Sequence, residues 1–474
     1  MIKDILKSLS GKRALVVGAG KSGDAAVRLL LSKGARVLLI DNTINEDLKN
    51  KAEDLKKLGA EVLLGIENIS DFNFDLVVVS PGVPIKSGLV KTLIDLKKPV
   101  IGELELGYHF VSSKIVAITG TNGKTTTTEL VEKIFTGCGY KAVACGNIGL
   151  SLCEVALEET RYDFLSLEVS SFQLETIIDF KPDVAILTNI TPDHFDRYAS
   201  IKEYISAKAR IFENQSDADW TIVQKEAKEL LQKEGVKIRG NLITYSATDL
   251  SADIYLKGQK IISRKRFLPR EVLGMDSMKL KGSHNAENLM ATLIVAAIYK
   301  LPIKKVLTIL RNYSPAPHRC ELVAEINGVK YINDSKATNV DAVAKAILSM
   351  GVNQSGTPNI LLIAGGKDKM FTFDEIKPVL KQRVKAVFLI GETAGKIFNS
   401  WKDCIQCFVS ETIDNAVVMA SKMAEPGDVV LLSPACSSFD QFKNYEHRGQ
   451  VFRNCVEKLK NYNILDNDVN KNTI

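Results

Sequence analysis

The stretch Lys114–Thr128 constrains the fold of this chain more than any other. It reads Lys-Ile-Val-Ala-Ile-Thr-Gly-Thr-Asn-Gly-Lys-Thr-Thr-Thr-Thr, an apolar run followed by a glycine-rich turn, a lysine and a series of hydroxyl residues. This order predicts a buried strand, a tight turn and a helix whose first N–H groups face an anion. Lys124 adds a positive charge there, and Thr125 can offer its hydroxyl to Mg²⁺. The stretch therefore predicts a chain that uses a nucleoside triphosphate.

The turn differs from the common phosphate loop. That pattern places a glycine six residues before the lysine, and this position is Ile118. The first glycine is Gly120, so the turn is shorter. Strand, turn and helix onset still agree, and we retain the phosphate-binding interpretation.

Composition excludes several classes of protein. The 474 residues are 45% hydrophobic and 25% charged, which is typical of a soluble protein with room for about three domains. The net charge of +6 comes from scattered residues without a basic stripe, so we expect no nucleic-acid partner. No run approaches the ~18 apolar residues of a membrane span. The eight cysteines are dispersed and there is no secretory signal, so we expect reduced thiols in the cytoplasm, with Cys404 and Cys407 an incidental pair.

Strand-like and helix-like patterns alternate along most of the chain, which predicts α/β domains with parallel sheets. Pro99 and Gly102 punctuate the first block, and Pro315-Ala-Pro317 marks the start of the third. We therefore predict domains at residues 1–102, 103–315 and 316–474. The stretch Trp220–Lys281 alternates more and contains several Gly and Asp turns, which suggests a β-rich insertion in the second domain.

The first domain contains a second glycine-rich turn. Gly18-Ala-Gly-Lys-Ser-Gly23 follows the strand Arg13–Val17, and Asp41 closes the next strand. Backbone N–H groups for a diphosphate and a carboxylate for ribose hydroxyls suit any nucleoside diphosphate, so a nicotinamide cofactor stays open. Ser80-Pro-Gly82 ends another strand of this domain at the same sheet edge.

The second domain places acidic and histidine side chains after strands. Glu168 ends the strand predicted at Asp163–Leu167, beside the phosphate loop, where it can hold Mg²⁺. The strand Asp183–Leu187 leads into a segment with Asp193, His194 and Asp196. By residue type alone, Lys208 on the following helix is only a solvated lysine.

Further polar loops recur at predicted strand ends in the third domain. They include Asn333–Asn339, Gly365–Lys369 and Ser433–Gln441, and the domain opens with Arg319, which can contact phosphate in a bidentate manner. Because such strand ends meet at one edge of a sheet, the loops are expected to converge on one crevice. Asn288, on a helix that starts near Ser283, can contact a purine or ribose.

Together these stretches resemble the Mur ligases of bacterial cell-wall synthesis. The most specific strings are Gly120–Lys124, Glu168–Glu175, Asp193–Tyr198, Asn333–Asn339 and Ser433–Cys436, and the short glycine turn is that family's own form. The resemblance implies three α/β domains: a Rossmann-like N-terminal domain for a UDP-sugar, a central P-loop ATPase-type domain with the β-rich insertion, and a Rossmann-like C-terminal domain for an amino acid.

The resemblance also implies roles for individual residues. Lys124, His194 and Lys208 are the implied catalytic residues, with Lys208 carbamoylated. The implied metal ligands are Thr125, Glu168, His194 and carbamoylated Lys208. The implied ATP contacts are Gly120, Thr121, Asn122, Gly123, Lys124, Thr125, Thr126, Asn288, Arg319, Asp334 and Lys336. The implied UDP-substrate contacts are Gly20, Lys21, Ser22, Asp41, Ser80, Pro81, Gly82 and Asn147, although Lys21-Ser22 stands where the family often has Leu-Thr. The implied contacts to D-glutamate are Thr338, Lys367, Ser438 and Tyr445, the last where phenylalanine is common.

The implied activity is an ATP-dependent ligation of D-glutamate to UDP-N-acetylmuramoyl-L-alanine. It would use two Mg²⁺ ions and pass through an acyl phosphate and a tetrahedral intermediate in peptidoglycan precursor synthesis. We expect a cytoplasmic monomer with small-molecule substrates and no membrane partner. The alternatives are a family member that adds L-alanine or a diamino acid, a nicotinamide-dependent oxidoreductase, and a P-loop switch without ligase activity.

Overall fold

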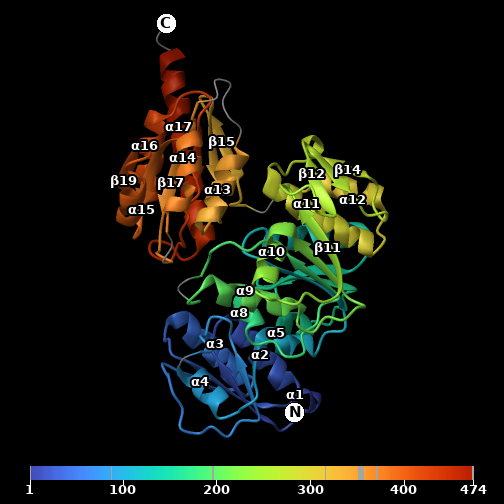
Figure 1. The fold of residues 1–474 in the computed structure, drawn as a ribbon. Helices are drawn as coiled ribbons and strands as arrows, with labels where there is room; N and C mark the ends of the chain where they lie inside the picture. Colours follow the sequence, from blue (N-terminus) through green and yellow to red (C-terminus); the bar gives the residue numbers. More distant parts are fainter. Residues whose placement is uncertain are drawn as a thin grey trace. The chain divides into compact units, whose positions relative to one another are not determined.

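A computed structural model describes residues 2–86, 88–194, 197–314, 317–350, 357–369 and 372–471, with side chains up to residue 460. The chain divides into two compact units. The first unit comprises Met1–Ile190, Ser200–Met278 and Asn285–Asn312, and the second comprises Thr191–Ala199, Lys279–His284 and Tyr313–Ile474. Two β-sheets lie in the first unit and a third lies in the second, each with helices around it (Figure 1). The three-domain α/β fold predicted from the sequence is therefore confirmed.

The N-terminal sheet is parallel throughout, with the strand order β3-β2-β1-β4-β5. The sequence pattern predicts strands at Arg13–Val17, Glu61–Leu64 and Leu76–Val79, and β1, β3 and β4 have these bounds, whereas β5 was not predicted. Helix α2 buries a row of small and branched side chains against this sheet. The elements are α1 (Ile2–Lys7), β1 (Arg13–Val17), α2 (Lys21–Ser32), β2 (Arg36–Asp41), α3 (Glu46–Lys57), β3 (Glu61–Leu64), β4 (Leu76–Val79), α4 (Gly88–Asp95) and β5 (Val100–Gly102).

The central sheet has the order β14-β13-β12-β11-β10-β9-β6-β8-β7. Strands β6 to β12 run parallel, and β13 and β14 run antiparallel to their neighbours. The predicted β-rich stretch thus continues the central sheet at one edge, with helix α10 between its first two strands. The strands are β6 (Lys114–Thr119), β7 (Ala142–Gly146), β8 (Phe164–Glu168), β9 (Val184–Leu187), β10 (Trp220–Gln224), β11 (Asn241–Ser246), β12 (Ile254–Lys257), β13 (Lys260–Ser263) and β14 (Glu271–Gly274).

Helices surround the central sheet. Helix α6 packs on β8 and β7, so the phosphate loop that precedes it lies at the carboxyl edge of the parallel strands. The helices are α5 (Glu103–Tyr108), α6 (Lys124–Gly137), α7 (Leu152–Leu157), α8 (Ser171–Leu174), α9 (Ile201–Ala209), α10 (Lys225–Lys233), α11 (Ser283–Ile298) and α12 (Ile303–Asn312), with short 3₁₀ helices η1 (Arg210–Phe212) and η2 (Met275–Ser277).

The C-terminal sheet has the order β15-β16-β20-β17-β18-β19, in which only β15 is antiparallel. Two clusters of buried apolar side chains cover its two faces. Because β16, β20 and β17 are parallel neighbours, their following loops emerge at one edge. The elements are β15 (Glu321–Ile326), β16 (Val329–Asn333), α13 (Val340–Ser349), β17 (Ile360–Gly365), η3 (Asp374–Ile376), α14 (Lys377–Arg383), β18 (Val384–Ile390), α15 (Ala394–Trp401), β19 (Cys407–Glu411), α16 (Ile413–Met423), β20 (Val429–Leu432) and α17 (Tyr445–Lys471).

Candidate active site

The predicted phosphate loop joins β6 to α6 through a turn that needs glycine. Gly120 and Gly123 adopt φ values of 140° and 85°, which side chains rarely allow. A Cβ atom at Gly120 would overlap Thr188 Oγ1, and one at Gly123 would overlap Asn288 Oδ1. The short turn is therefore held tightly from both sides, with the first turn of α6 directly after it.

Residues after β9 support this loop, and sequence reasoning did not find them. The amides of Thr121 and Asn122 donate to Asn189 O and Asn189 Oδ1, each at 2.9 Å. Thr188 Oγ1 donates to Asn122 O at 2.6 Å. The only signal in the sequence is their position directly after a buried strand. Thr188 and Asn189 reach the loop because β9 pairs with β6, and this strand order is not visible in the sequence.

Two lysines converge on one carbonyl oxygen of the loop. Lys124 Nζ donates to Gly120 O at 3.0 Å and to Thr121 O at 2.8 Å. Lys208 Nζ, on α9, donates to Gly120 O at 2.7 Å and lies 4.5 Å from the centroid of the Tyr204 ring. Lys208 is only 2% exposed. The structure thus brings Lys208 to the loop, where two positive charges face the place of an anion.

Glu168 ends β8 directly beside the loop strand, since Ile118 of β6 pairs with it. Its Oε1 accepts from Asn147 Nδ2 at 2.9 Å, and its backbone carbonyl accepts from the Asn147 amide at 2.9 Å. Its Oε2 is buried and has no hydrogen-bond partner among the described residues. A buried carboxylate oxygen without a donor is costly in a protein and suits a cation. The donor set around the loop therefore fits Mg²⁺, with Thr125 in the first turn of α6.

Asn288 reaches the loop from α11. Its Oδ1 accepts from Thr127 Oγ1 at 3.2 Å, and its Nδ2 donates to Asn285 Oδ1 at 3.1 Å. Thr126, in the first turn of α6, is buried. The structure therefore gathers Lys124, Thr125, Asn288, Glu168 and Lys208 around one glycine turn.

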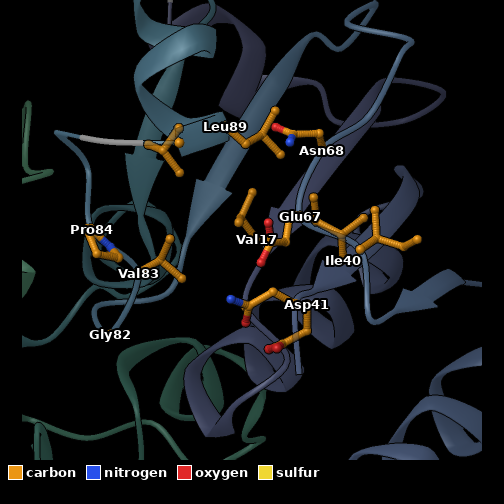
Figure 2. A pocket seen from close by; sticks show the side chains of 14 residues that line it. Val17, Ile40, Asp41, Glu67, Asn68, Gly82, Val83, Pro84 and Leu89 are labelled. Atoms are coloured by element: carbon orange, nitrogen blue, oxygen red, sulfur yellow. The ribbon is translucent and has the colours of Figure 1, made fainter. Parts of the chain in front are cut away.

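A pocket of about 340 Å³ opens at the carboxyl edge of the N-terminal sheet. Figure 2 shows Val83 and Pro84 on one side of it and Ile40 on the other, with Asp41 below. Asp41 and Gly82, two of the predicted UDP-substrate contacts, line this pocket. Its other lining residues are Val17, Gly18, Asn42, Ile66, Glu67, Asn68, Gly88, Leu89 and Val90, of which sequence reasoning named only Gly18 as part of a motif.

The glycine turn beside this pocket is closed by its own contacts. Asp41 accepts from the amides of Ala19 at 2.6 Å and Thr43 at 2.7 Å, so each carboxylate oxygen already has a donor. Ser80 Oγ donates to Gly18 O at 2.9 Å. Asp41 therefore fixes the turn, which leaves one further lone pair per oxygen for a ribose.

Several predicted contacts to the UDP-substrate lie outside the lining of the pocket. Gly20 caps α2, and Lys21 and Ser22 are the first residues of that helix. Lys21 Nζ donates to Gly149 O at 2.5 Å and lies 3.5 Å from Glu154 Oε2, both on the central domain. Ser80 and Pro81 stand beside the turn rather than in the pocket. Asn147 is next to Glu168, as described above.

In the second unit, Asp193 makes several polar contacts beside His194. Asp193 Oδ2 accepts from Asn339 Nδ2 at 3.2 Å and lies 3.7 Å from His194 Nε2. Lys369 Nζ lies 3.7 Å from Asp193 Oδ1. His194 has a φ of 57°, a conformation that local contacts must maintain. Asp196, the third acidic or histidine residue of this segment, lies outside the described residues.

The predicted loops of the C-terminal sheet meet as expected. The Asp334 amide donates to Leu432 O at 2.8 Å, and Ser433 Oγ donates to Asp334 Oδ2 at 2.8 Å. The Lys367 amide donates to Ser437 O at 2.9 Å. Burial raises the pKa of Asp334 to about 7, with Arg319 and the Ser433 hydroxyl acting in the opposite direction. The three loops therefore meet at one edge of the C-terminal sheet.

The side chains on these loops differ in exposure. Lys336 Nζ lies 3.9 Å from the centroid of the Tyr445 ring. Lys367 Nζ pairs with Glu392 Oε2 at 2.8 Å, and this carboxylate raises the pKa of Lys367. Ser438 is buried, and Thr338 is half-buried in the same loop as Lys336. Sequence reasoning missed Glu392 and also Arg448, which lies beneath the loops.

Two other clusters are structural. Cys407 is the first residue of β19 and Cys404 lies in the turn before it, and burial raises the pKa of Cys407 to about 11. Glu105, His109 and Asp179 place possible ligand atoms within 4.8 Å of one another. However, Glu105 accepts the amides of residues 178, 179 and 180 at 2.8–3.0 Å, so it caps that segment.

No helix among the described residues is long and apolar enough to cross a membrane.

Three family models match the chain in order. They are the Mur ligase MurD-like N-terminal domain at residues 12–102, the Mur ligase middle domain at 118–296, and the Mur ligase glutamate ligase domain at 318–436. Each match corresponds to one of the three sheets, although the middle match begins within β6, and together they cover most of the chain.

Proteins named UDP-N-acetylmuramoylalanine–D-glutamate ligase are similar over nearly the full length. The protein of Geotalea uraniireducens is 41% identical over 456 residues, covering 95% of this chain and 98% of the relative. That of Pelotomaculum thermopropionicum is 40% identical over 463 residues, covering 96% of this chain and 100% of the relative.

Solved structures share the fold at low identity. The UDP-N-acetylmuramate–alanine ligase MurC of Thermotoga maritima aligns with a TM-score of 0.58 and 18% identity, covering 95% of this chain and 100% of that one. A pseudomurein peptide ligase of Methanothermus fervidus aligns with a TM-score of 0.57 and 19% identity, over 95% of this chain and 100% of that one. At this identity the structural likeness indicates the fold alone.

Proposed function

The chain belongs to the Mur ligase family, and from that premise we propose that it joins D-glutamate to UDP-N-acetylmuramoyl-L-alanine with ATP, a step of peptidoglycan precursor synthesis. One observation carries the proposal: relatives that are 38–41% identical over 95–96% of this chain bear the name of that ligase. The glycine-rich loop with Lys124 and Lys208 supports the use of ATP. Two further polar sites, in the N-terminal domain and on the C-terminal sheet, give places for two more substrates.

The reaction needs an activated carboxylate, because a free carboxylate is a poor electrophile. The carboxylate oxygen of the L-alanyl group attacks the γ-phosphorus of ATP, and ADP leaves. The amine of D-glutamate then attacks the acyl carbon, and the tetrahedral intermediate expels phosphate to leave an amide. The amine proton leaves in this second step, and the described residues assign it no acceptor.

The loop residues favour the first step by binding and orienting the triphosphate. Backbone N–H groups at the start of α6 and the ammonium of Lys124 face the phosphates, where they stabilise charge on the transferring group. Bound Mg²⁺ would supply further charge neutralisation and orient the phosphoryl oxygens. We propose two ions, held by Thr125, Glu168, His194 and Lys208.

Lys208 fits this role only after a chemical change. As an ammonium it is a donor, and it donates to Gly120 O. Carbamoylation would form a bond between Nζ and the carbon of CO₂, with loss of two protons from the ammonium to solvent, and would turn the cation into a carboxylate-like anionic ligand. We propose this modification because a buried lysine among metal-directed groups otherwise repels the metal.

The remaining sites suit the other two substrates. The pocket of about 340 Å³ would take the nucleoside end of the UDP-sugar, and the turn at α2 its diphosphate. D-glutamate would bind at the edge of the C-terminal sheet, where it would contact Thr338, Lys367, Ser438 and Tyr445. Because these substrates are held by separate units, we propose that the units close on one another during turnover. One unchanged arrangement in scattering with and without ligands would contradict closure.

Phosphate release from ATP is the deciding assay. We expect release with UDP-N-acetylmuramoyl-L-alanine and D-glutamate together, and none with L-glutamate. Equal release with both amino acids, or with neither, would overturn the proposal, and ATP hydrolysis without any amino acid would favour a P-loop switch. Tight binding of a nicotinamide dinucleotide by the intact protein would favour the oxidoreductase. We further propose that the protein is a monomer in the cytoplasm. Light scattering of the purified protein measures its mass and so tests whether it is a monomer.

A further inference from the structure

Arg448, near the start of α17, is a buried cation beneath the loops of the C-terminal sheet. It is 0% exposed. Its Nε donates to Ser335 Oγ at 3.0 Å, and its Nη2 donates to Ser335 O at 2.9 Å. Its Nη1 donates to Cys436 O at 3.1 Å and Ser437 O at 3.2 Å. One guanidinium therefore joins the loop 333–339 to the loop 433–441.

Its hydrogen-bond partners are neutral. None of the described carboxylates forms an ion pair with Arg448. Burial lowers the pKa of Arg448 to about 10, so it stays charged at neutral pH. A buried charge without an ion-pair partner is costly, and the groups that accept its hydrogen bonds are one hydroxyl and three peptide carbonyls. A neutral side chain of similar length would fill the same space without that cost, so packing alone does not account for the arginine.

The contacts of Arg448 lie next to residues already placed at the site. Ser335 stands between Asp334 and Lys336, and its hydroxyl donates to Tyr445 O at 2.8 Å in the first turn of α17. Ser437 precedes Ser438, and its carbonyl also accepts from the Lys367 amide. A shift of the guanidinium would therefore move both loops and α17 together.

The peptide between Ser437 and Ser438 links Arg448 to the direction of the Ser438 N–H. In a trans peptide the C=O and the following N–H point in opposite directions, and no cis peptide occurs among the described residues. Because Ser437 O faces Arg448, the Ser438 N–H points away from it. Neither this amide nor the Ser438 hydroxyl has a hydrogen-bond partner among the described residues. Two adjacent donors are thus left for a ligand.

We propose that Arg448 is a positioning residue of the amino-acid subsite. Its positive charge at Ser437 O polarises the peptide and aims the Ser438 N–H at a carboxylate of the incoming amino acid. This inference rests on the proposed function, which brings a dicarboxylic amino acid to these loops. Arg448 itself does not touch the substrate, since the loops cover it.

The test compares Arg448→Lys and Arg448→Met by steady-state phosphate release in the full-length protein. Lysine keeps the charge but brings three N–H groups for four acceptors, so we expect KM for D-glutamate to rise about tenfold. Methionine removes the charge, and we expect a rise of about 100-fold. KM for UDP-N-acetylmuramoyl-L-alanine should change less than about threefold, because the first unit binds it.

Arg453→Lys is the matched control. Arg453 lies on the same helix, and its guanidinium pairs with Glu321 of β15 rather than with a carbonyl oxygen of the two loops. We expect its KM for D-glutamate to stay within about twofold of the parent. The melting temperature of every variant is measured as well. If the role of Arg448 is purely structural, KM for D-glutamate rises as the melting temperature falls across the variants. Arg448→Met then has a KM no higher than that of Arg448→Lys, since a buried ammonium without a counter-charge destabilises the fold.

The outcomes separate the inference from the proposed function. The inference is supported if the KM for D-glutamate is lower in Arg448→Lys than in Arg448→Met, whatever the melting temperatures of the two variants. KM for all substrates rising in parallel, or a KM for D-glutamate that does not rise with methionine, overturns it. If methionine does not fold, the KM of Arg448→Lys against Arg453→Lys decides alone. If the parent protein itself shows no release with D-glutamate, the proposed function fails before any variant is compared.

Discussion

The chain contains two glycine-rich turns between a first strand and a helix, and their surroundings differ in charge. The turn at Gly18–Gly23 is closed by Asp41, whose two oxygens each accept a backbone amide. The turn at Gly120–Gly123 faces Lys124 and Lys208, which share one carbonyl oxygen. In the first turn a carboxylate accepts a backbone amide, whereas in the second turn two lysine ammonium groups donate to one carbonyl oxygen.

The carboxylates beside the two turns show the same contrast. Asp41 ends β2 and Glu168 ends β8, each on the strand next to the one that enters the turn. Both oxygens of Asp41 have a donor, while Glu168 Oε2 has none among the described residues. Similar backbone motifs can thus serve a diphosphate without metal or a triphosphate with metal, and the side chains around them decide which.

The largest expected effect is at Lys124. Lys124→Met removes the ammonium that faces the transferring phosphoryl group, and we expect kcat to fall about 10³-fold. Binding of UDP-N-acetylmuramoyl-L-alanine, measured by calorimetry, should be unchanged, because the other glycine turn serves it. Lys133→Met on the same helix is the control, since Lys133 is an exposed partner of Glu132. A kcat close to that of the parent would remove the distinction between the two turns.

The next effect sharpens the contrast between the carboxylates. We expect Glu168→Gln to raise the Mg²⁺ concentration needed for half-maximal rate by about 10–100-fold. Its stability should be equal or higher, because the buried charge that lacks a donor is gone. Asp41→Asn should show the opposite pattern. We expect its stability to fall by about 1–3 kcal/mol, because one oxygen that accepts a backbone amide is replaced by NH₂, and its Mg²⁺ requirement to stay unchanged. Denaturant unfolding and Mg²⁺ titration measure both, and the same phenotype from both variants would contradict the contrast.

The sequence was a good guide where strands are buried on both faces. Runs such as Leu76–Val79 have one apolar residue after another and appear at the predicted bounds. The strands β7, β15 and β19 were not predicted, because they lie at sheet edges and are partly exposed. Half-buried edge strands lack both the continuous apolar run and a clean alternation.

The candidate site was predictable in its backbone motifs and less so in its supports. Glycine turns, Lys124 and Glu168 follow from strand–turn–helix order. Thr188 and Asn189 act on the loop only because β9 pairs with β6, which the sequence does not display. Arg448 gives even less signal, since an arginine on a polar helix is usually solvated. Lys208 needed the family resemblance to be singled out.

A smaller effect tests how closely the first turn is packed. A Cβ atom at Gly23 would overlap Gly18 O, a backbone atom that cannot move without opening the turn. We expect Gly23→Ala to lower the free energy of unfolding by about 1–3 kcal/mol, measured by urea denaturation. Gly20→Ala is the matched control, since nothing lies within 4 Å of a Cβ there and its φ is −65°. Equal stability of the two variants would show that the turn is not closed by packing.

The smallest effect concerns Lys21, the lysine of the first turn. Its ammonium is directed to Gly149 O and Glu154 on the central domain, and its side chain is 60% exposed. Exposed pairs of this kind contribute about 0–1 kcal/mol, so Lys21→Leu should change stability little and raise KM for UDP-N-acetylmuramoyl-L-alanine less than about threefold. A lysine that binds the diphosphate would instead give a large rise in KM that shrinks as salt increases, because salt screens the contact in the parent. Measuring KM at low and high salt for both proteins separates these cases. A strongly salt-dependent effect would mean that this turn also relies on a lysine, as the Lys124 turn does, and the contrast in charge between them would not hold.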